Sequence, residues 1–317
     1  MKAVISKKRQ VVVEPKSKDS IYDVPVLVKA LAYTITTLFA FACLYPFLLV
    51  VAVSFSDEQA ILANGYQLIP EKFSLEGYKY IMQNAGQILW SYGVTIMVTV
   101  VGTTLSLFIK SLYAYTISRP SFPWKSQFTF FIFFTTLFSG GMLPKYIINT
   151  QMLGLQDSFW ALVLPGLCTT MHIIMMRTYM QTAIPNAVVE SARMDGAGEF
   201  LCYFRIVLPM SIPIIATMAL FAVTMFWNDW YRAFLYIVSN TKMIPIQLLL
   251  QRLETETKFL QQNAADFGGS VSAMQQDIPT ETFKMCLVVT VVTPILIFYP
   301  FFQQYFVNGI TVGAVKG

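Results

Sequence analysis

Residues 190–209 read ESARMDGAGEFLCYFRIVLP, a charged stretch in a chain that is otherwise strongly apolar. Of the 317 residues, 56% are hydrophobic and only 12% are charged, whereas a soluble domain is about one quarter charged. The stretch sets acidic residues and arginines around a Gly-Ala-Gly turn and ends on Leu208-Pro209. Its meaning depends on the apolar sequence on either side.

The stretch itself has the signals of two short helices joined by a turn. Pro185 suits a first helical position, residues 187–194 contain no strong helix breaker, and Gly196 suits a left-handed helix end. The spacing predicts a second helix from Glu199 to Val207, with an apolar face on which these side chains lie: Phe200, Tyr203, Phe204 and Val207. Pro209 ends it. The residues alone leave open whether this is a rigid lever for a partner protein or a well-capped connector.

The small side chains of Ser191 and Ala192 would allow another protein surface to approach the backbone closely. Glu190 and Arg193 are placed to pair one helical turn apart. Both features favour a firm surface knob.

Apolar blocks of membrane-spanning length flank the stretch, since a span needs roughly 20 predominantly apolar residues. The six blocks are Val26–Val53, Gly93–Ile117, Phe128–Leu143, Phe159–Met176, Ile212–Val238 and Met285–Phe306. The expected fold is an all-α integral membrane protein with six transmembrane helices spread over residues 26–308.

Basic residues set the expected orientation of these spans. Most of the 22 Lys and Arg fall in segments that share one side, with Lys110 added to them if its side chain snorkels inward. The positive-inside rule then places both termini in the cytoplasm. Residues 1–25 form a cytoplasmic arm, 184–209 a cytoplasmic loop, 239–282 an external loop and 309–317 a cytoplasmic tail.

Two external features and one internal residue are candidates for function. Ile246, Leu249, Leu250 and Leu253 follow one helical face, which predicts a helix at the lipid interface or against a partner. The aromatic and polar side chains of one short run are candidates for sugar contact or a gate, with an aromatic belt and an Asp229–Arg232 pair as the alternative: Trp227, Asn228, Asp229, Trp230 and Tyr231. His172, the only histidine, is expected to be a neutral, hydrogen-bonded packing residue.

Several motifs resemble the permeases of binding-protein-dependent ABC importers. The so-called EAA loop of that family reads here Glu190-Ser191-Ala192, Gly196, Ile206 and Leu208-Pro209, with Ser191 in place of the usual alanine. The stretches SGGMLP (139–144) and FWNDWY (226–231) and the tail NGITVGAVKG (308–317) are similar to maltose-type carbohydrate permeases, in particular to those that import oligosaccharides derived from complex polysaccharides.

The resemblance implies a type I ABC importer permease fold in the bacterial cell membrane, with partners that supply the rest of the machine. The implied partners are a second homologous permease, two ATPase subunits, an external solute-binding protein and an oligosaccharide. It also implies an ATPase-coupling role for Glu190, Ser191, Ala192, Asp195, Gly196, Ile206, Leu208 and Pro209. The implied tail contacts with the ATPase are Gly309, Thr311 and Gly313.

The same resemblance predicts a transport subunit rather than an enzyme, with no cofactor of its own. ATP and Mg²⁺ would be bound by the partner ATPase, which agrees with the absence of a GxxxxGK[ST] phosphate loop from this sequence. The four cysteines show no CxxC spacing, so no metal site is expected. The alternatives are a permease for another solute class or a secondary transporter, although no apolar block carries a central Asp or Glu.

Overall fold

The computed structural model describes residues 25–83, 85–263 and 280–314. Residues up to Leu48 and from Leu49 onward form two separately packed units. The first unit consists of most of α1 (Val26–Ser54), whose side chains are exposed throughout residues 25–46. This helix is one unbroken apolar segment of 29 residues despite Pro46, as the first apolar block predicts.

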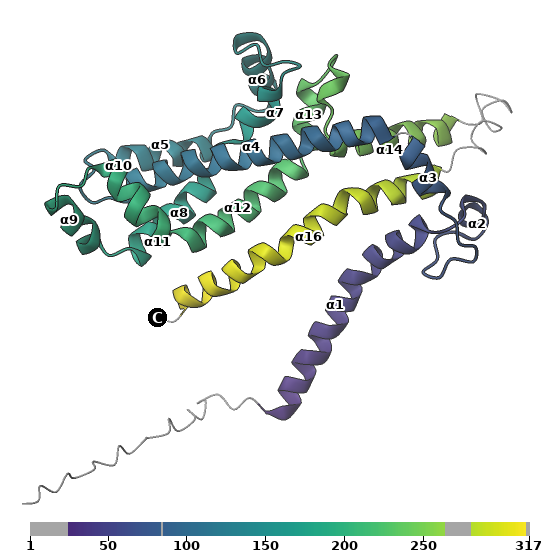
Figure 1. Cartoon of the computed structure of the whole chain (residues 1–317), viewed down its shortest axis with the longest axis horizontal. Helices are drawn as coiled ribbons and strands as arrows, with labels where there is room; N and C mark the ends of the chain where they lie inside the picture. Colours follow the sequence, from purple (N-terminus) through teal and green to yellow (C-terminus); the bar gives the residue numbers. More distant parts are fainter. Residues whose placement is uncertain (1–24, 84, 264–279, 315–317) are drawn as a thin grey trace, which may run out of the picture. The chain divides into compact units, whose positions relative to one another are not determined.

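The second unit is built mainly from helices in its described residues (Figure 1). At one end of this unit lie α2 (Glu58–Asn64), α3 (Glu76–Gln83) and α14 (Ile246–Asn263). The middle of the chain forms α4 (Ala85–Ser118), α5 (Lys125–Leu137), α6 (Met142–Ile147), a π-helical turn (Ile148–Met152), α7 (Phe159–Val163), a 3₁₀ turn (Leu164–Gly166) and α8 (Thr170–Ala183). There follow α9 (Asn186–Met194), α10 (Glu199–Cys202), a second π-helical turn (Tyr203–Val207), α11 (Leu208–Met210), α12 (Ile212–Trp227), α13 (Trp230–Tyr236), a 3₁₀ turn (Thr241–Met243) and α16 (Thr280–Ala314).

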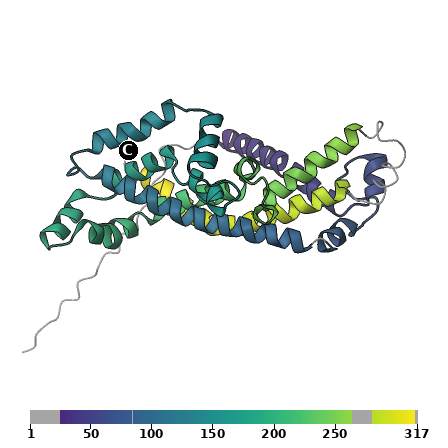
Figure 2. The same cartoon turned by 90° about the horizontal axis from the view of Figure 1, so that it is seen from above.

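The long helix α4 is the axis on which this unit is packed. Helices α8 and α12 lie along it, and α16 packs on α12 (Figures 1 and 2). Gly102 permits close contact between α4 and α12, because a Cβ atom there would lie 2.7 Å from the Phe226 ring of α12. Buried apolar side chains form two clusters. The one around the half of α4 that begins at Ala85 is called the outer core cluster, and the one around the opposite end of α4 is called the inner core cluster.

Three helices in the described part of the chain are long and apolar enough to cross a membrane, and three bent pairs pass the same test together. The bends are 114° between α5 and α6, 50° between the two parts of the Phe159–Ala183 segment, and 80° before α12. Counting each pair as one gives up to six spans, in the order of the six apolar blocks.

Two blocks end earlier than their composition suggests. The third block was expected to reach Leu143, but α5 stops at Leu137, where Phe138 takes an extended conformation as the C-cap, and a new helix starts after Gly141, whose φ of 82° a glycine adopts readily. The fifth block was expected to reach Val238, but α12 ends at Trp227 and α13 starts anew with the Asp229 side chain as its N-cap.

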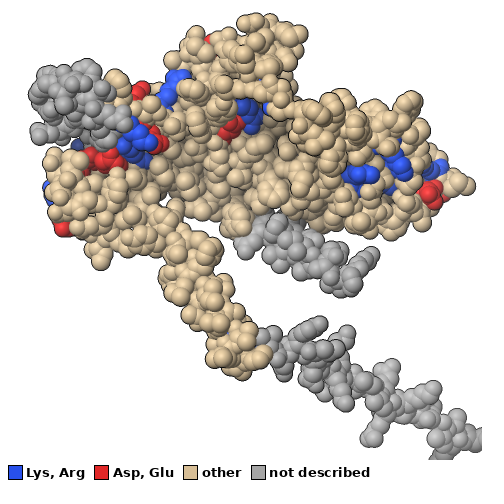
Figure 3. All heavy atoms as spheres, turned by 180° about the vertical axis from the view of Figure 1, so that it is seen from behind, with Lys and Arg blue, Asp and Glu red and all other residues tan. Residues whose placement is uncertain are grey.

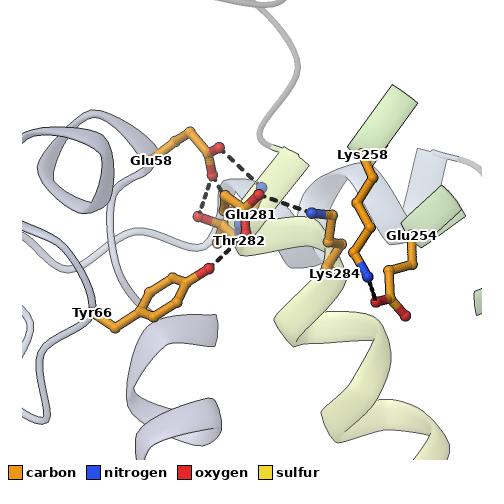
Figure 4. A network of polar contacts seen from close by, with 7 residues as sticks. All are labelled: Glu58, Tyr66, Glu254, Lys258, Glu281, Thr282 and Lys284. Atoms are coloured by element: carbon orange, nitrogen blue, oxygen red, sulfur yellow. Dashed lines mark hydrogen bonds and ion pairs between the residues drawn. The ribbon is translucent and has the colours of Figure 1, made fainter. Parts of the chain in front are cut away.

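The first turn of α16 is held by a carboxylate from α2 (Figure 4). Glu58 accepts hydrogen bonds from the backbone N–H of Glu281 (3.0 Å) and Thr282 (2.8 Å) and from the Thr282 hydroxyl (2.7 Å). A negative charge suits the N-terminus of a helix, where N–H groups lack intrahelical partners. Tyr66 donates to Glu281, which also pairs with Lys284, so the outer end of α16 is anchored from two sides.

The amphipathic helix predicted after residue 246 is present as α14, but its apolar face is covered by the chain itself. Ile246, Leu248 and Leu249 are buried in the outer core cluster, with Leu250 and Leu253 packed against it. The expectation of a lipid-facing or partner-facing apolar surface was therefore wrong. Its buried backbone start is also satisfied internally, since Ile246 N–H donates to Thr95.

Lys110 does not meet the condition for counting it with the basic residues of one side, namely that its side chain snorkels to the membrane surface. It is fully buried, and its Nζ lies 3.1 Å from Nδ1 of His172 on α8. The His172 ring is stacked on Phe221 with ring centroids 5.7 Å apart. The interpretation of His172 as a hydrogen-bonded packing residue is confirmed.

Candidate functional site

The charged stretch forms an elbow at one end of the second unit, made of α9, α10, the π-helical turn and α11 (Figure 1). Helix α9 begins after Pro185, which occupies the N-cap and not the first helical position. Val189 is buried in the inner core cluster, whereas Glu190, Ser191 and Met194 are exposed. The elbow therefore has one face on the bundle and one face free in this chain.

The turn between α9 and α10 depends on Gly196, as the sequence predicts. Gly196 has φ 86°, the left-handed conformation that ends many helices. The N–H of Gly196 donates to the carbonyl of Arg193 and that of Ala197 to the carbonyl of Ala192, each at 2.9 Å. These bonds close the last turn of α9 and fix the angle at which α10 leaves.

Glu199 ties the elbow to α4. Its carboxylate accepts a hydrogen bond of 2.7 Å from Tyr115 of α4 and forms an ion pair with Arg193. Arg193 also donates to Ser121 at 3.1 Å, in the turn that follows α4. The expected pair of Glu190 with Arg193 is thus replaced by a longer-range pair, because the Gly196 turn brings Glu199 back over α9.

The second helical segment is not a regular helix, and this changes which residues face inward. Tyr203–Val207 is π-helical, so one extra residue per turn shifts the apolar face. Tyr203 and Val207 are buried as predicted, but Phe200 is 71% exposed and Phe204 46% exposed. The four side chains of the predicted apolar face therefore do not share one environment. Phe200 and Met194, which is 89% exposed, instead give the free face of the elbow an apolar character.

The elbow passes directly into a span. Pro209 lies in the first turn of α11, and the axis bends by 80° between residues 199–210 and α12. Tyr203 is hydrogen bonded to Ser111 of α4 at 2.6 Å, which holds the segment before the bend. Of the residues assigned to coupling by resemblance, Ala192, Ile206 and Leu208 are half-buried, and Asp195, Gly196 and Pro209 are exposed.

The candidate run Trp227–Tyr231 lies at the other end of α12. Trp227 is buried and donates to the Val291 carbonyl of α16 at 3.2 Å. The Asp229–Arg232 ion pair predicted from their spacing is present. Asn228 is exposed and bonded to Gln247, and Trp230 and Tyr231 are exposed. The structure therefore gives Trp227 a packing role and leaves three exposed side chains on this surface.

Asp157, which sequence reasoning missed, organises the loop beyond this run. One oxygen of its carboxylate accepts three backbone N–H groups, from Val238 (2.7 Å), Ser239 (2.9 Å) and Asn240 (3.1 Å). These bonds, with that of Asn240 foremost, lower the pKa of Asp157. The only sequence signal is an Asp next to Ser158, a pairing too common in turns to single out.

The tail residues Gly309, Thr311 and Gly313 fall within the last turns of α16, which continues to Ala314. The backbone there is helical. Residues 315–317 and the N-terminal arm up to residue 24 lie outside the described part of the chain. Within the described part, no group of three or more potential ligands could hold a metal ion.

The fold combines apolar helices and bent helix pairs of membrane-spanning length with a polar elbow at one end. Residues 96–312 match the family described as binding-protein-dependent transport system inner membrane component. The chain belongs to that family. It is a permease subunit of an ABC importer, embedded in the membrane, and not an enzyme.

Relatives cover nearly the whole chain. The polygalacturonan/rhamnogalacturonan transport system permease protein YtcP of Bacillus subtilis is 37% identical over 90% of this chain and 97% of its own. Protein LplC of Bacillus subtilis is 36% identical over 86% of this chain and 89% of its own. A chain in the crystal structure of a bacterial ABC transporter that imports the acidic polysaccharide alginate matches with a TM-score of 0.75 and 27% identity, over 88% of this chain and 96% of that one. Family membership implies a partner ATPase and a solute-binding protein.

Proposed function

We propose that this chain is one of two homologous permease subunits through which an ABC importer carries an oligosaccharide released from an acidic plant or microbial polysaccharide. The substrate class is supported by two of the similar proteins, which transport polygalacturonan or rhamnogalacturonan and alginate. Two ATPase subunits, a second permease and an external binding protein complete the proposed complex. The chain itself binds no cofactor, and ATP and Mg²⁺ belong to the ATPase.

In this proposal the six spans are α1, α4, α5 with α6, α7 with α8, α10–α12, and α16, with both termini in the cytoplasm. The orientation is supported by the balance of charges at the end that carries the elbow, where Figure 3 shows basic side chains with few acidic ones, whereas both kinds lie together at the opposite end. Such an excess of Lys and Arg is typical of the cytoplasmic side.

The observation that carries the mechanism is the geometry of the elbow. Its free face presents Glu190, Ser191, Met194 and Phe200, which a groove in the ATPase can receive. Its other side is bonded to α4 through Glu199 and continues into α12. When the ATPase subunits close, a push on α9 is therefore transmitted to the two most closely packed spans, as a switch between two discrete arrangements requires.

The outer residues Asn228, Trp230 and Tyr231 are proposed to contact sugar or to form a gate, and Asp229 to hold their backbone. Gly309, Thr311 and Gly313 are proposed to lie against the ATPase, presented by the end of α16. Each assignment has its own test, since replacing the outer residues should alter uptake of sugar and shortening α16 should alter ATPase regulation.

The experiment that tests the function is ATPase stimulation of the reconstituted four-subunit complex by its binding protein, across a panel of uronate-containing and neutral oligosaccharides. The expected result is stimulation by one or more uronate-containing glycans. Stimulation by a solute that is not a glycan would refute the substrate class. ATP hydrolysis by this chain purified alone would refute the division of labour between permease and motor.

A further inference from the structure

A small cavity lies beside the elbow, where the turn after α4 meets α9 and α10. Its volume is about 230 Å³, and its lining includes Tyr115, Arg119, Ser121, Phe122, Arg193 and Glu199. A water molecule takes up roughly 30 Å³, so the cavity has room for a tetrahedral anion and some water.

The charges around this cavity do not balance. Two guanidinium groups, those of Arg119 and Arg193, share one carboxylate, that of Glu199. This carboxylate is already engaged by Tyr115 and Arg193. Arg119 instead lies over the ring of Tyr115, with its Cζ 5.0 Å from the ring centroid, and no salt bridge joins it to an acid in the described residues.

The donors around the cavity are unsatisfied as well. Arg119 is only 4% exposed, yet its Nε and Nη2 are buried without a hydrogen-bond partner among the described residues, and the same holds for Nε of Arg193. Buried polar groups are paired in nearly all proteins. Burial, together with the nearby charge of Arg193, lowers the pKa of Arg119, which is the effect expected of a cation that lacks its anion.

We propose that this cavity binds a phosphate group at the membrane surface, where Arg119 and Arg193 hold its oxygens. A guanidinium presents its N–H groups in a planar fork that matches a phosphate. The position favours the headgroup of an anionic lipid as the source, because Trp124, which is 59% exposed, lies in the same turn. Tryptophan is typical of the membrane–water interface, and basic pockets between spans on the cytoplasmic side are suited to anionic headgroups.

A bound phosphate would connect the turn at 119–124 to α9 through the two arginines. It would thereby stiffen the attachment of the elbow to α4, and the coupling of ATP hydrolysis to transport would depend on anionic lipid. This inference rests on the proposed function only for the placement of the elbow at the cytoplasmic surface.

The test measures binding to the purified complete complex in detergent, with three probes. Dioctanoyl phosphatidylglycerol supplies the lipid phosphate, inorganic phosphate supplies the free ion, and dioctanoylglycerol is the lipid without phosphate. The variants are Arg119→Gln and Arg193→Gln, with Lys125→Gln as the matched control, because it removes an exposed positive charge next to the same turn without lining the cavity.

We expect Arg119→Gln to raise the Kd of phosphatidylglycerol by about tenfold or more, since a charge-assisted hydrogen bond is lost. Lys125→Gln should change it less than about twofold, as an exposed charge at a distance contributes little. Displacement of bound phosphatidylglycerol by inorganic phosphate supports a phosphate site that both probes share. Tight binding of inorganic phosphate but not of the lipid supports the same site with a soluble source.

Equal binding of phosphatidylglycerol by wild type and both arginine variants overturns the proposal, as does equal binding of dioctanoylglycerol. The proposal is also overturned if the wild-type complex binds no phosphate and the Arg119→Gln complex loses its ATPase subunits. That result would assign the cavity to a carboxylate of the ATPase. Should Arg119→Gln fail to assemble, Arg193→Gln carries the same comparison. Sugar uptake is not a readout, so an error in the proposed substrate leaves this test intact.

Discussion

The conformation of Gly196 can be tested by comparison with a glycine two residues away. Gly196 has φ 86°, whereas Gly198 has φ −73° and ψ 164°, which any residue adopts. A Cβ atom at either position would meet nothing within 4 Å. The variants Gly196→Ala and Gly198→Ala therefore add the same methyl group to open space and differ only in what the backbone tolerates.

The magnitude follows from three effects. An L-residue in the left-handed region costs about 1–2 kcal/mol, and this applies to Gly196→Ala alone. The entropy lost by the unfolded chain on Gly→Ala is the same for both variants and cancels. Gly198 is the N-cap of α10, where alanine is worse than glycine by about 0.5 kcal/mol. The net difference is about 0.5–1.5 kcal/mol, or about a 2- to 12-fold difference in local opening at 1.4 kcal/mol per factor of ten.

Hydrogen exchange of peptides covering residues 190–200 in the purified complex measures this opening. The amides of residues 196 and 197, which close the last turn of α9, should show protection factors about 2- to 12-fold lower in Gly196→Ala than in Gly198→Ala. The number of solute molecules imported per ATP should fall in the first variant and hold in the second. Equal protection and equal coupling in the two variants would show that the left-handed turn is not what fixes the elbow.

Three further predictions concern other parts of the fold. Glu58→Gln should weaken the start of α16 by about 0.5–2 kcal/mol and lower the thermal stability of the purified complex, and an unchanged melting curve would contradict the capping role. Gly102→Ala should destabilise the complex by about 1–3 kcal/mol through overpacking against Phe226. The control Gly93→Ala should not, because nothing lies within 4 Å of its added Cβ. Identical melting temperatures for the two variants would argue against close contact between the helices. The pKa of Asp157 is lowered on folding. Its hydrogen bonds therefore contribute their full stability above the unfolded pKa of about 3.9. This contribution is lost as the pH falls from there through the lower pKa of the folded state. Cleavage by pepsin at residues 238–240 should thus rise below about pH 4 in wild type, and Asp157→Asn should remove this dependence on pH.

The apolar segments could be predicted from sequence because the thickness of the bilayer sets the length that a spanning segment needs. All six blocks contain helix, and the break at Gly140–Gly141 follows from glycines that signal it locally. The left-handed turn at Gly196 was equally accessible, since it depends on one residue. What these successes share is that the cause lies within a few residues of the effect.

The failures have the opposite character. From its sequence position, Lys110, eight residues before the end of α4, could either snorkel to the membrane surface or be buried. Only its contact with His172 on another helix selects burial. The inward face of residues 199–207 depended on a π-helical turn, which inserts a residue without a local signal. Arg193 had one candidate partner in its own helix, but a turn that reverses the chain supplied a better one. Each outcome was decided by a contact made between separate elements.

The position of Glu199 explains why the elbow is suited to transmit force and not merely to connect two spans. A connector bonded only through the backbone would rotate about the 80° bend before α12 when pushed at α9. Glu199 and Tyr203 prevent this, because they fasten the segment before the bend to Tyr115 and Ser111, one helical turn apart on α4. Since α4 and α12 are in turn packed through Gly102 and Phe226, the proposed mechanism has displacement of α9 carry both spans together, so that the movement reaches the residues after α12.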